Sequence, residues 1–247
     1  MNSIEKPSAI QCLAWKTGLE AIRSSINFDN FEDFRFDLYK RMPQNSEGVR
    51  IRYANLIFLR LFRERNLDGI NPKVWRNYQD ENILEDLARL TTLEVEPVIA
   101  KFVIEHVLIL SPGMLIENSS IQDYISSIYG VYKRDAYTRL RTAIIHMGFV
   151  SSVRTGLMVQ PIPLPDNALL LVLHARLAPT PRIVRISEVL SGVFWKLLGI
   201  REESTVRSIL QDAASKGLIA KYVLVDQLEQ ITTRYSYEDF VSQALRI

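Results

Sequence analysis

Apolar residues recur at helical spacing through the first part of the chain, and start and stop signals separate the runs. Ser46-Glu47 and Asp80-Glu81 each place a capping residue before an acid, and Asn71-Pro72 resembles the start of a helix. Ser111-Pro112-Gly113 then ends the last run. The pattern predicts helices over about 7–25, 28–41, 46–65, 80–90 and 94–110, with a further helix starting at 71–72.

From residue 119 the pattern combines helices with short apolar runs typical of strands. Helices are predicted over 119–130 and 132–147, and Gly148 fits the residue that follows a helix. Two strands, 149–153 and 157–162, are predicted around Arg154-Thr155-Gly156, where a tight hairpin favours glycine. Three closely spaced prolines at 161, 163 and 165 then predict a stiff connector.

A similar order follows the connector. Helices are predicted over 167–176, 187–198 and 204–217, and a hairpin over 219–225 and 228–233 around Asp226-Gln227. Ser236, with acids within three residues, is expected to cap a terminal helix. The chain therefore carries two successive helix–helix–hairpin patterns.

Two segments carry a resemblance to a known superfamily. RLRTAIIHMGFVSSVRTGLMV (139–159) and TVRSILQDAASKGLIAKYVLVDQLEQITTRY (205–235) each lead from a helix through a glycine into a pair of strands. This layout resembles winged helix-turn-helix domains, over about 119–245. The resemblance implies a mainly α fold with small β wings, and a helix that enters the DNA major groove.

The expected organisation has three parts. A helical domain (1–118) precedes a first winged helix (119–165) and a second (166–247). We expect 1–118 to be all helical, and we expect it to pack against the rest because no flexible Gly/Ser linker lies near 111–118.

Composition limits the cellular setting. The chain is 47% hydrophobic and 23% charged, which is ordinary for a globular protein with a core. Its single cysteine excludes an internal disulfide. Lys101, Glu105 and Pro112 interrupt the longest apolar run, so a membrane span is not expected. The amino terminus shows no signal-peptide pattern, and a cytoplasmic location is expected.

Charge distinguishes the two winged-helix patterns, although the whole chain carries only +2. Residues 119–165 hold five basic and two acidic residues. Helical spacing turns Ala136, Leu140, Ala143, Ile144 and Met147 inward, and the remaining face and the wing tip carry hydrogen-bond donors suited to phosphate and base edges. The predicted DNA-binding residues are Lys133, Arg134, Thr138, Arg139, Arg141, Thr142, Arg154 and Thr155. A solvated cationic helix face is the alternative.

The second pattern favours a different role. Residues 166–247 hold ten basic and nine acidic residues, and Glu202 and Glu203 precede the helix that exposes Arg207. Acids at that end would repel phosphate. A contact with a protein partner or with a second copy of the chain, or a purely structural role, is therefore favoured here.

Arginines also concentrate on the long helix near 46–65, but not in one stripe. These are Arg50, Arg52, Arg60, Arg63 and Arg65. Salt bridges to acids such as Glu47, Glu64, Glu81 and Glu85 explain them as well as nucleic acid does.

Motifs for catalysis or cofactor binding are not found in the sequence. The glycines are dispersed, so no phosphate-binding loop is predicted. His106, His146 and His174 are far apart, and Cys12 is expected to be a buried, inert thiol, which leaves no zinc pattern. No acid stands two residues before a lysine, as a common class of metal-dependent nuclease requires. We therefore expect no catalytic residues, no metal and no cofactor.

The sequence favours two functions. One is a DNA-binding regulator, or a subunit of a DNA-acting complex, that contacts duplex DNA through the first winged helix. The alternative is an adaptor that docks proteins through its winged helices. A helical enzyme with an unrecognised site is a weaker third possibility.

Overall fold

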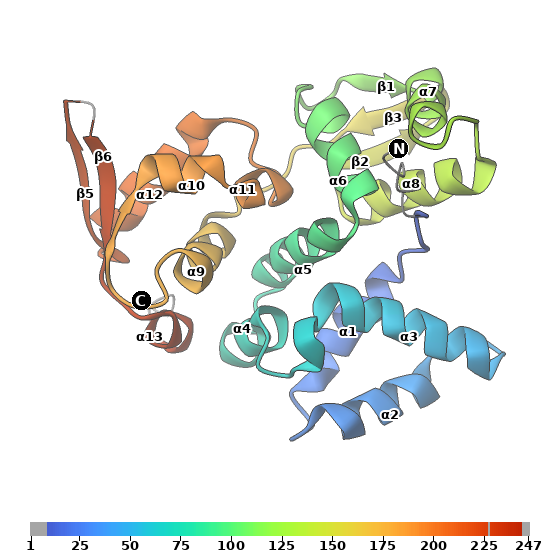
Figure 1. Cartoon of the computed structure of the whole chain (residues 1–247), viewed down its shortest axis with the longest axis horizontal. Helices are drawn as coiled ribbons and strands as arrows, with labels where there is room; N and C mark the ends of the chain where they lie inside the picture. The colour runs from blue at the N-terminus through green and yellow to red at the C-terminus, as the bar shows by residue number, and fades with distance from the viewer. Residues whose placement is uncertain (1–8, 227, 244–247) are drawn as a thin grey trace, which may run out of the picture.

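The fold is mainly helical and carries two small three-stranded antiparallel sheets. The computed structural model describes residues 9–226 and 228–243. Figure 1 shows three groups of elements around a central helix, α5 (Glu81–Val95). One group contains the N-terminal helices, and each of the other two contains one of the sheets.

The N-terminal group has an aromatic core. Rings of Phe31, Phe34, Phe58 and Phe62 pack with centroids 4.8–6.4 Å apart. Asn30 caps the second helix, since its Oδ1 accepts the Asp33 N–H at 3.0 Å. The group comprises α1 (Trp15–Ser25), α2 (Phe31–Arg41), α3 (Glu47–Leu61), the short 3₁₀ turn η1 (Arg63–Arg65) and α4 (Ile70–Tyr78).

The predicted helix over 7–25 begins later than expected, at Trp15. Pro7 lies outside the described residues, and 9–14 form no helix. The backbone of this segment bonds instead to distant side chains: the Ile10 N–H donates to Tyr129 Oη, and the Cys12 carbonyl accepts from Arg60 Nη1 at 2.8 Å. Cys12 is half-buried, so the expectation of a buried thiol on a helix face was wrong.

The further helix expected to start at 71–72 is present as α4, but Asn71 does not cap it. The helix α4 starts at Ile70, and Asn71 is buried. Its Nδ2 donates to the Leu61 carbonyl at 2.9 Å and to Thr91 Oγ1 at 3.0 Å. The Leu61 carbonyl lies at the end of α3 and has no donor within that helix, so the Asn71 amide supplies the donor. The sequence around Asn71 does not reveal this role.

The central helix α5 is longer than predicted and is buried on most of its surface. It runs to Val95, and Pro97 opens a new helix, α6 (Pro97–Phe102), which continues as a π-helical turn, η2 (Val103–Val107). The prediction of one helix over 94–110 was therefore wrong, because Pro97 fits only a first turn. Every residue from Leu87 to Leu93 is buried, and α1, α3, α4, α9 (Asp166–Arg176) and α11 (Phe194–Leu197) contact α5.

The group that contains the first sheet has the order strand, two helices, hairpin. Its elements are β1 (Leu115–Glu117), α7 (Asn118–Tyr129), α8 (Arg134–His146), β2 (Val150–Val153) and β3 (Gly156–Val159). The sheet order is β1-β3-β2, and Glu117 lies opposite Gly156. The expectation that 1–118 is all helical was therefore wrong. A division at 118 would separate β1 from its partner strand.

The second sheet follows a similar order, with three helices in place of two. Its elements are β4 (Ile183–Arg185), α10 (Ile186–Ser191), α11, α12 (Glu203–Ser215), β5 (Ile219–Val225) and β6 (Leu228–Thr233). The sheet order is β4-β6-β5, which matches that of the first sheet, and α9 precedes β4 as α6 precedes β1. The single helix predicted over 187–198 is two short helices separated at Gly192. The predicted hairpin strands have the observed bounds, and Gln227 of the predicted turn lies outside the described residues.

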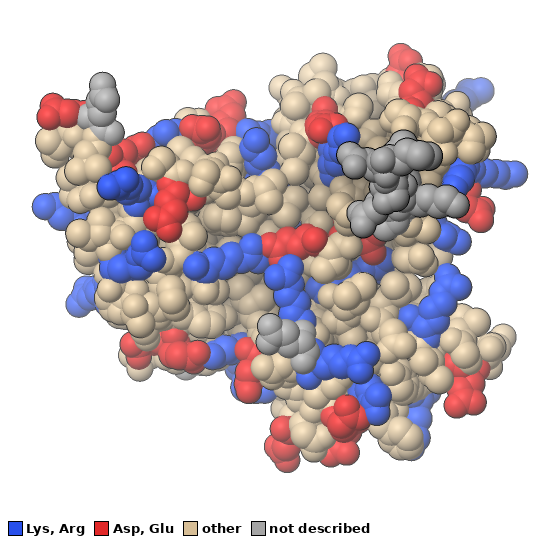
Figure 2. Space-filling model, in the orientation of Figure 1, with Lys and Arg blue, Asp and Glu red and all other residues tan. Residues whose placement is uncertain are grey.

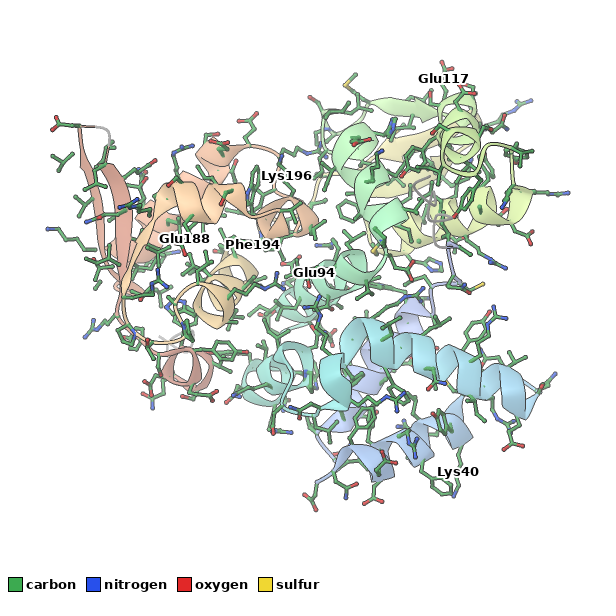
Figure 3. All side chains as sticks on the ribbon, viewed as in Figure 1. Lys40, Glu94, Glu117, Glu188, Phe194 and Lys196 are labelled. Carbon is green, nitrogen blue, oxygen red and sulfur yellow. The ribbon has the colours of Figure 1, made fainter. Side chains whose placement is uncertain are left out.

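The predicted packing between the first 118 residues and the rest is confirmed. α5 contacts α9 and α11, and α6 contacts α8. The terminal helix α13 (Tyr237–Ser242), capped by Ser236 as expected, packs against α4 and α9. Glu94, labelled near the centre of Figure 3, receives hydrogen bonds from Arg63 beside α3 and from Arg176 at the end of α9. One carboxylate therefore joins elements from both halves.

Candidate nucleic-acid interface

The helix α8 buries the face that the sequence predicted and exposes part of the opposite face. Ala136, Leu140, Ala143, Ile144 and Met147 are all buried. Lys133, Arg134 and Thr138 are exposed, and Thr142 is half-buried. The start of α8 therefore presents two cations and a hydroxyl to solvent, together with one exposed acid, Asp135.

Arg141 is engaged within the protein, contrary to the expectation that it projects freely. Its guanidinium is half-buried and donates to Asn118 Oδ1, to Tyr137 Oη at 2.8 Å and to Ser152 Oγ at 3.2 Å. Asn118 begins α7 and Ser152 lies on β2. Arg141 thus ties α8 to α7 and to the hairpin. Its long side chain reaches partners that helical spacing alone does not identify.

Arg139 is also occupied. Its Nη1 donates to the carbonyl of Ile10 at 3.0 Å, and its side chain is half-buried rather than outward. Ile10 itself is buried against the first sheet group, where its N–H reaches Tyr129 Oη at 3.3 Å. The N-terminal segment therefore covers part of the helix face assigned to DNA.

The β2–β3 turn carries the remaining predicted residues. Arg154 and Thr155 are both exposed, and the Thr155 carbonyl accepts the Asn118 N–H at 3.3 Å. Gly156 follows at a point where a Cβ atom would lie 2.1 Å from the Ile116 carbonyl oxygen. Only glycine allows β3 to approach β1 this closely. Because α7 begins directly after β1, this close approach holds the basic turn near the start of α7.

Three predicted cations remain available for a ligand. Within the described residues, Arg134 and Arg154 form no ion pair, and the Lys133 ammonium lies 4.6 Å from the centre of the Tyr129 ring. Basic side chains project at the molecular edge beside α8 in Figure 2 with an acidic group among them, and basic and acidic groups are interspersed over the rest of that face.

In the second sheet group the helix that corresponds to α8 is α12, and acidic residues neutralise the charge of its Arg207. Arg207 on α12 donates to Glu229 of β6 at 3.0 Å and to Glu203 at 3.2 Å, and its hydrogen bond to the Glu229 carboxylate raises the pKa of Arg207. Tyr222 of β5 also donates to Glu229, and burial together with that carboxylate raises the pKa of Tyr222 to about 12. The expected weakness of this helix as a phosphate site is consistent with its geometry, although Glu229 rather than Glu202 supplies the second acid.

The arginines of the α3 region mostly have structural partners, but not the acids proposed from the sequence. Arg60 is buried and bonds to Glu96 at 2.9 Å, and Arg63 bonds to Glu94. Glu81 pairs with Arg23 instead. The side chain of Glu64 lies outside the described part of the structure. The pairs join residues more than thirty positions apart, so local sequence could not identify them.

The histidines lie in separate environments. His174 is fully buried and stacks on Phe240 with ring centres 3.9 Å apart, and burial lowers its pKa. His106 packs between Phe102 and Tyr124. Among the described residues, no three His, Cys, Asp or Glu side chains gather as metal ligands.

Comparisons with protein-family models, curated proteins and solved structures find no match to the chain. None of the described helices has both the length and the apolar character needed to cross a membrane. The function must therefore be argued from the geometry of the surface itself.

Proposed function

We propose that this protein binds duplex DNA through the start of α8 and the β2–β3 turn, without catalysing a reaction. The observation that carries the proposal is the set of exposed cations at these two places, Lys133, Arg134 and Arg154, none of them in an ion pair with a described residue. Unpaired cations beside a helix start and a hairpin suit contacts with phosphate.

The order of elements supports an assignment of both sheet groups as winged helix-turn-helix units. In each, a helix and a strand precede a pair of helical segments and a hairpin, with α10 and α11 together taking the place of α7 in the second group, and the first strand pairs with the last. In such units the second helix of the pair enters the major groove. That helix is α8 in the first unit and α12 in the second.

We expect residues on α8 and residues around it to make different kinds of contact with DNA. Arg134 and Thr138 lie four residues apart on one face of α8, where they reach a groove together. Lys133, Arg154 and Thr155 suit backbone phosphates. Arg141 positions the hairpin against α8 through Ser152, and Arg139 holds the N-terminal segment, so we assign neither of them a primary DNA contact.

The test is a duplex titration at several salt concentrations with the full chain. Replacing Arg134 and Arg154 by alanine should weaken binding and reduce the slope of log affinity against log salt by about one for each phosphate that is no longer neutralised. Arg185→Ala is the matched control, since Arg185 is an exposed arginine of the second unit without an ion pair among the described residues. Equal losses of affinity in the two sets of variants, or no binding at low salt, would overturn the proposal.

A specific observation favours the adaptor as a second candidate. The hairpin of the second unit carries exposed apolar residues near its turn: Leu224 is 64% exposed, Val225 58% and Leu228 46%. A hairpin that meets DNA would carry donors there, whereas apolar side chains suit a protein surface. Glutamate substitutions at Leu224 and Leu228 would abolish such a contact and leave DNA affinity unchanged.

A further inference from the structure

A shallow groove of about 790 Å³ runs along α3 and is separate from the exposed cations of the first unit. Its floor is the outer face of α3, with Ile51 and Leu59, and its far side is formed by Gln11 of the N-terminal segment and Arg139 of α8. At Gly48 an added Cβ would meet no atom within 4 Å, so the groove is open at that end.

The groove floor is an apolar helix face with no packing partner among the described residues. Leu59 is 57% exposed and Ile51 37% exposed, although both lie on a helix whose other face enters the aromatic core. They lie eight residues apart, so they form a row along one side of α3. The residue between them, Asn55, bonds through Oδ1 to Tyr39 Oη at 3.0 Å. Exposed apolar rows with polar rims suit the apolar ridge of a partner helix.

The rim of this groove is positively charged. Arg52 and Arg139 both line it, and no carboxylate of the described residues does. Arg52 forms no ion pair within the described residues, and Arg139 is held in place by the Ile10 carbonyl at 3.0 Å. A ligand that fills the groove must therefore bring negative charge to both sides of an apolar ridge.

We propose that this groove binds an amphipathic helix of a partner protein, with apolar residues on one face and acidic residues beside them. A nucleic-acid backbone would match Arg52 and Arg139 but would leave Ile51 and Leu59 opposite charged phosphates. Two copies of the groove facing each other would bring four arginines together without an acid. The acidic helix satisfies both the apolar floor and the charged rim.

The test uses the full chain and two panels of labelled helical peptides. One panel places leucines at spacings of i, i+3, i+4 and i+7 with flanking glutamates, and the matched panel carries lysines in place of the glutamates. Fluorescence anisotropy should show binding by acidic peptides only. Leu59→Glu and Arg52→Glu should each weaken that binding roughly tenfold or more, as truncation of a central interface residue does.

Phe36→Glu is the matched control, because Phe36 is an apolar residue 61% exposed on the neighbouring helix α2, outside the groove. It should leave peptide affinity unchanged, and thermal melts of all variants should stay close to that of the unmodified chain. Equal binding of both panels, equal losses in Phe36→Glu and Leu59→Glu, or no binding by any acidic peptide would overturn the proposal. If light scattering showed that the chain associates with itself and that Leu59→Glu abolishes this association, the occupant of the groove would be a second copy of the chain. If Arg52→Glu lowered DNA affinity and left peptide affinity unchanged, the occupant would be nucleic acid.

Discussion

At the scale of single residues, Asp86 shows how burial changes a carboxylate. It lies on α5 and accepts a hydrogen bond from Arg89 Nη1 at 2.6 Å, yet burial outweighs this partner and raises its pKa to about 6. Arg89 in turn donates from Nε to the Met147 carbonyl at 2.9 Å. The guanidinium is therefore shared between a side chain and a helix end.

This pKa predicts a pH dependence of stability with a defined sign. Between the unfolded value of 3.8 and about 6, the folded chain binds a proton at Asp86 that the unfolded chain does not. The contribution of Asp86 to the free energy of unfolding is thus highest below pH 3.8. This contribution is lost as the pH rises through 6, and the loss is at most about 3 kcal/mol. Asp86→Asn removes this dependence while keeping an acceptor for Arg89.

Denaturant titrations of both proteins between about pH 4 and pH 7 check the prediction, and the variant should gain relative to the original chain as the pH rises. His174 acts in the opposite direction, because its lowered pKa costs stability as the pH falls below 6.5. It is present in both proteins and cancels in the comparison. A difference in unfolding free energy that does not change with pH would show that Asp86 titrates normally.

The sequence identified exposed residues of the candidate interface better than it identified their partners. Helical spacing correctly predicted the buried face of α8 and the exposure of Arg134, and the predicted turn correctly placed Arg154 on the surface. It failed at Arg139 and Arg141, because their hydrogen-bond acceptors lie at Ile10 and Asn118, far along the chain. Long side chains that pair across elements leave no local periodic signal.

At the scale of elements, the close approach of β1 to β3 gives a test of the first sheet. Gly156→Ala would place a methyl group 2.1 Å from the Ile116 carbonyl oxygen, so the strands must separate or shift. We expect a decrease of about 1–3 kcal/mol in unfolding free energy, measured by chemical denaturation. Gly48→Ala is the control, since its methyl group meets no atom and alanine favours the helix by up to about 1 kcal/mol. Similar decreases in the two variants would mean that the close approach of the strands is unimportant.

Elements with strong local signals were predicted well, and those defined by distant partners were not. Both hairpins were predicted from short apolar runs on either side of a turn. The bounds of β5 and β6 match the prediction, whereas the strand predicted over 157–162 ends at Val159. The three-residue strand β1 exists because β3 pairs with it, so its own sequence carries little signal. The break predicted between helices 80–90 and 94–110 lies instead at Glu96, between the end of α5 and the start of α6.

At the scale of the whole molecule, Glu94 joins the two halves. Its carboxylate is 11% exposed and accepts hydrogen bonds from Arg63 and Arg176. Glu94→Gln should lower the unfolding free energy by about 1–2 kcal/mol, since the variant removes charged hydrogen bonds at a mostly buried acceptor. Hydrogen exchange should quicken at the end of α9, where Arg176 lies.

Glu238→Gln provides a comparison at an exposed link between the same halves. Glu238 pairs with Lys73 across α13 and α4, but its side chain is 70% exposed. Exposed pairs contribute about 0–1 kcal/mol, so this variant should change stability little. If both variants behave alike, the connection between the halves rests on apolar packing of α5, not on Glu94.

The burial of α5 also has a consequence for the order in which the chain is made. Residues 81–95 leave the ribosome well before 166–176 and 194–197, yet they are packed against both of those helices in the finished protein. At a synthesis rate of about 5–20 residues per second, the emerging N-terminal helices wait for several seconds with one side of α5 uncovered. During that interval the newborn chain offers an apolar helix face to chaperones, and its first part reaches its final form only when the second unit arrives.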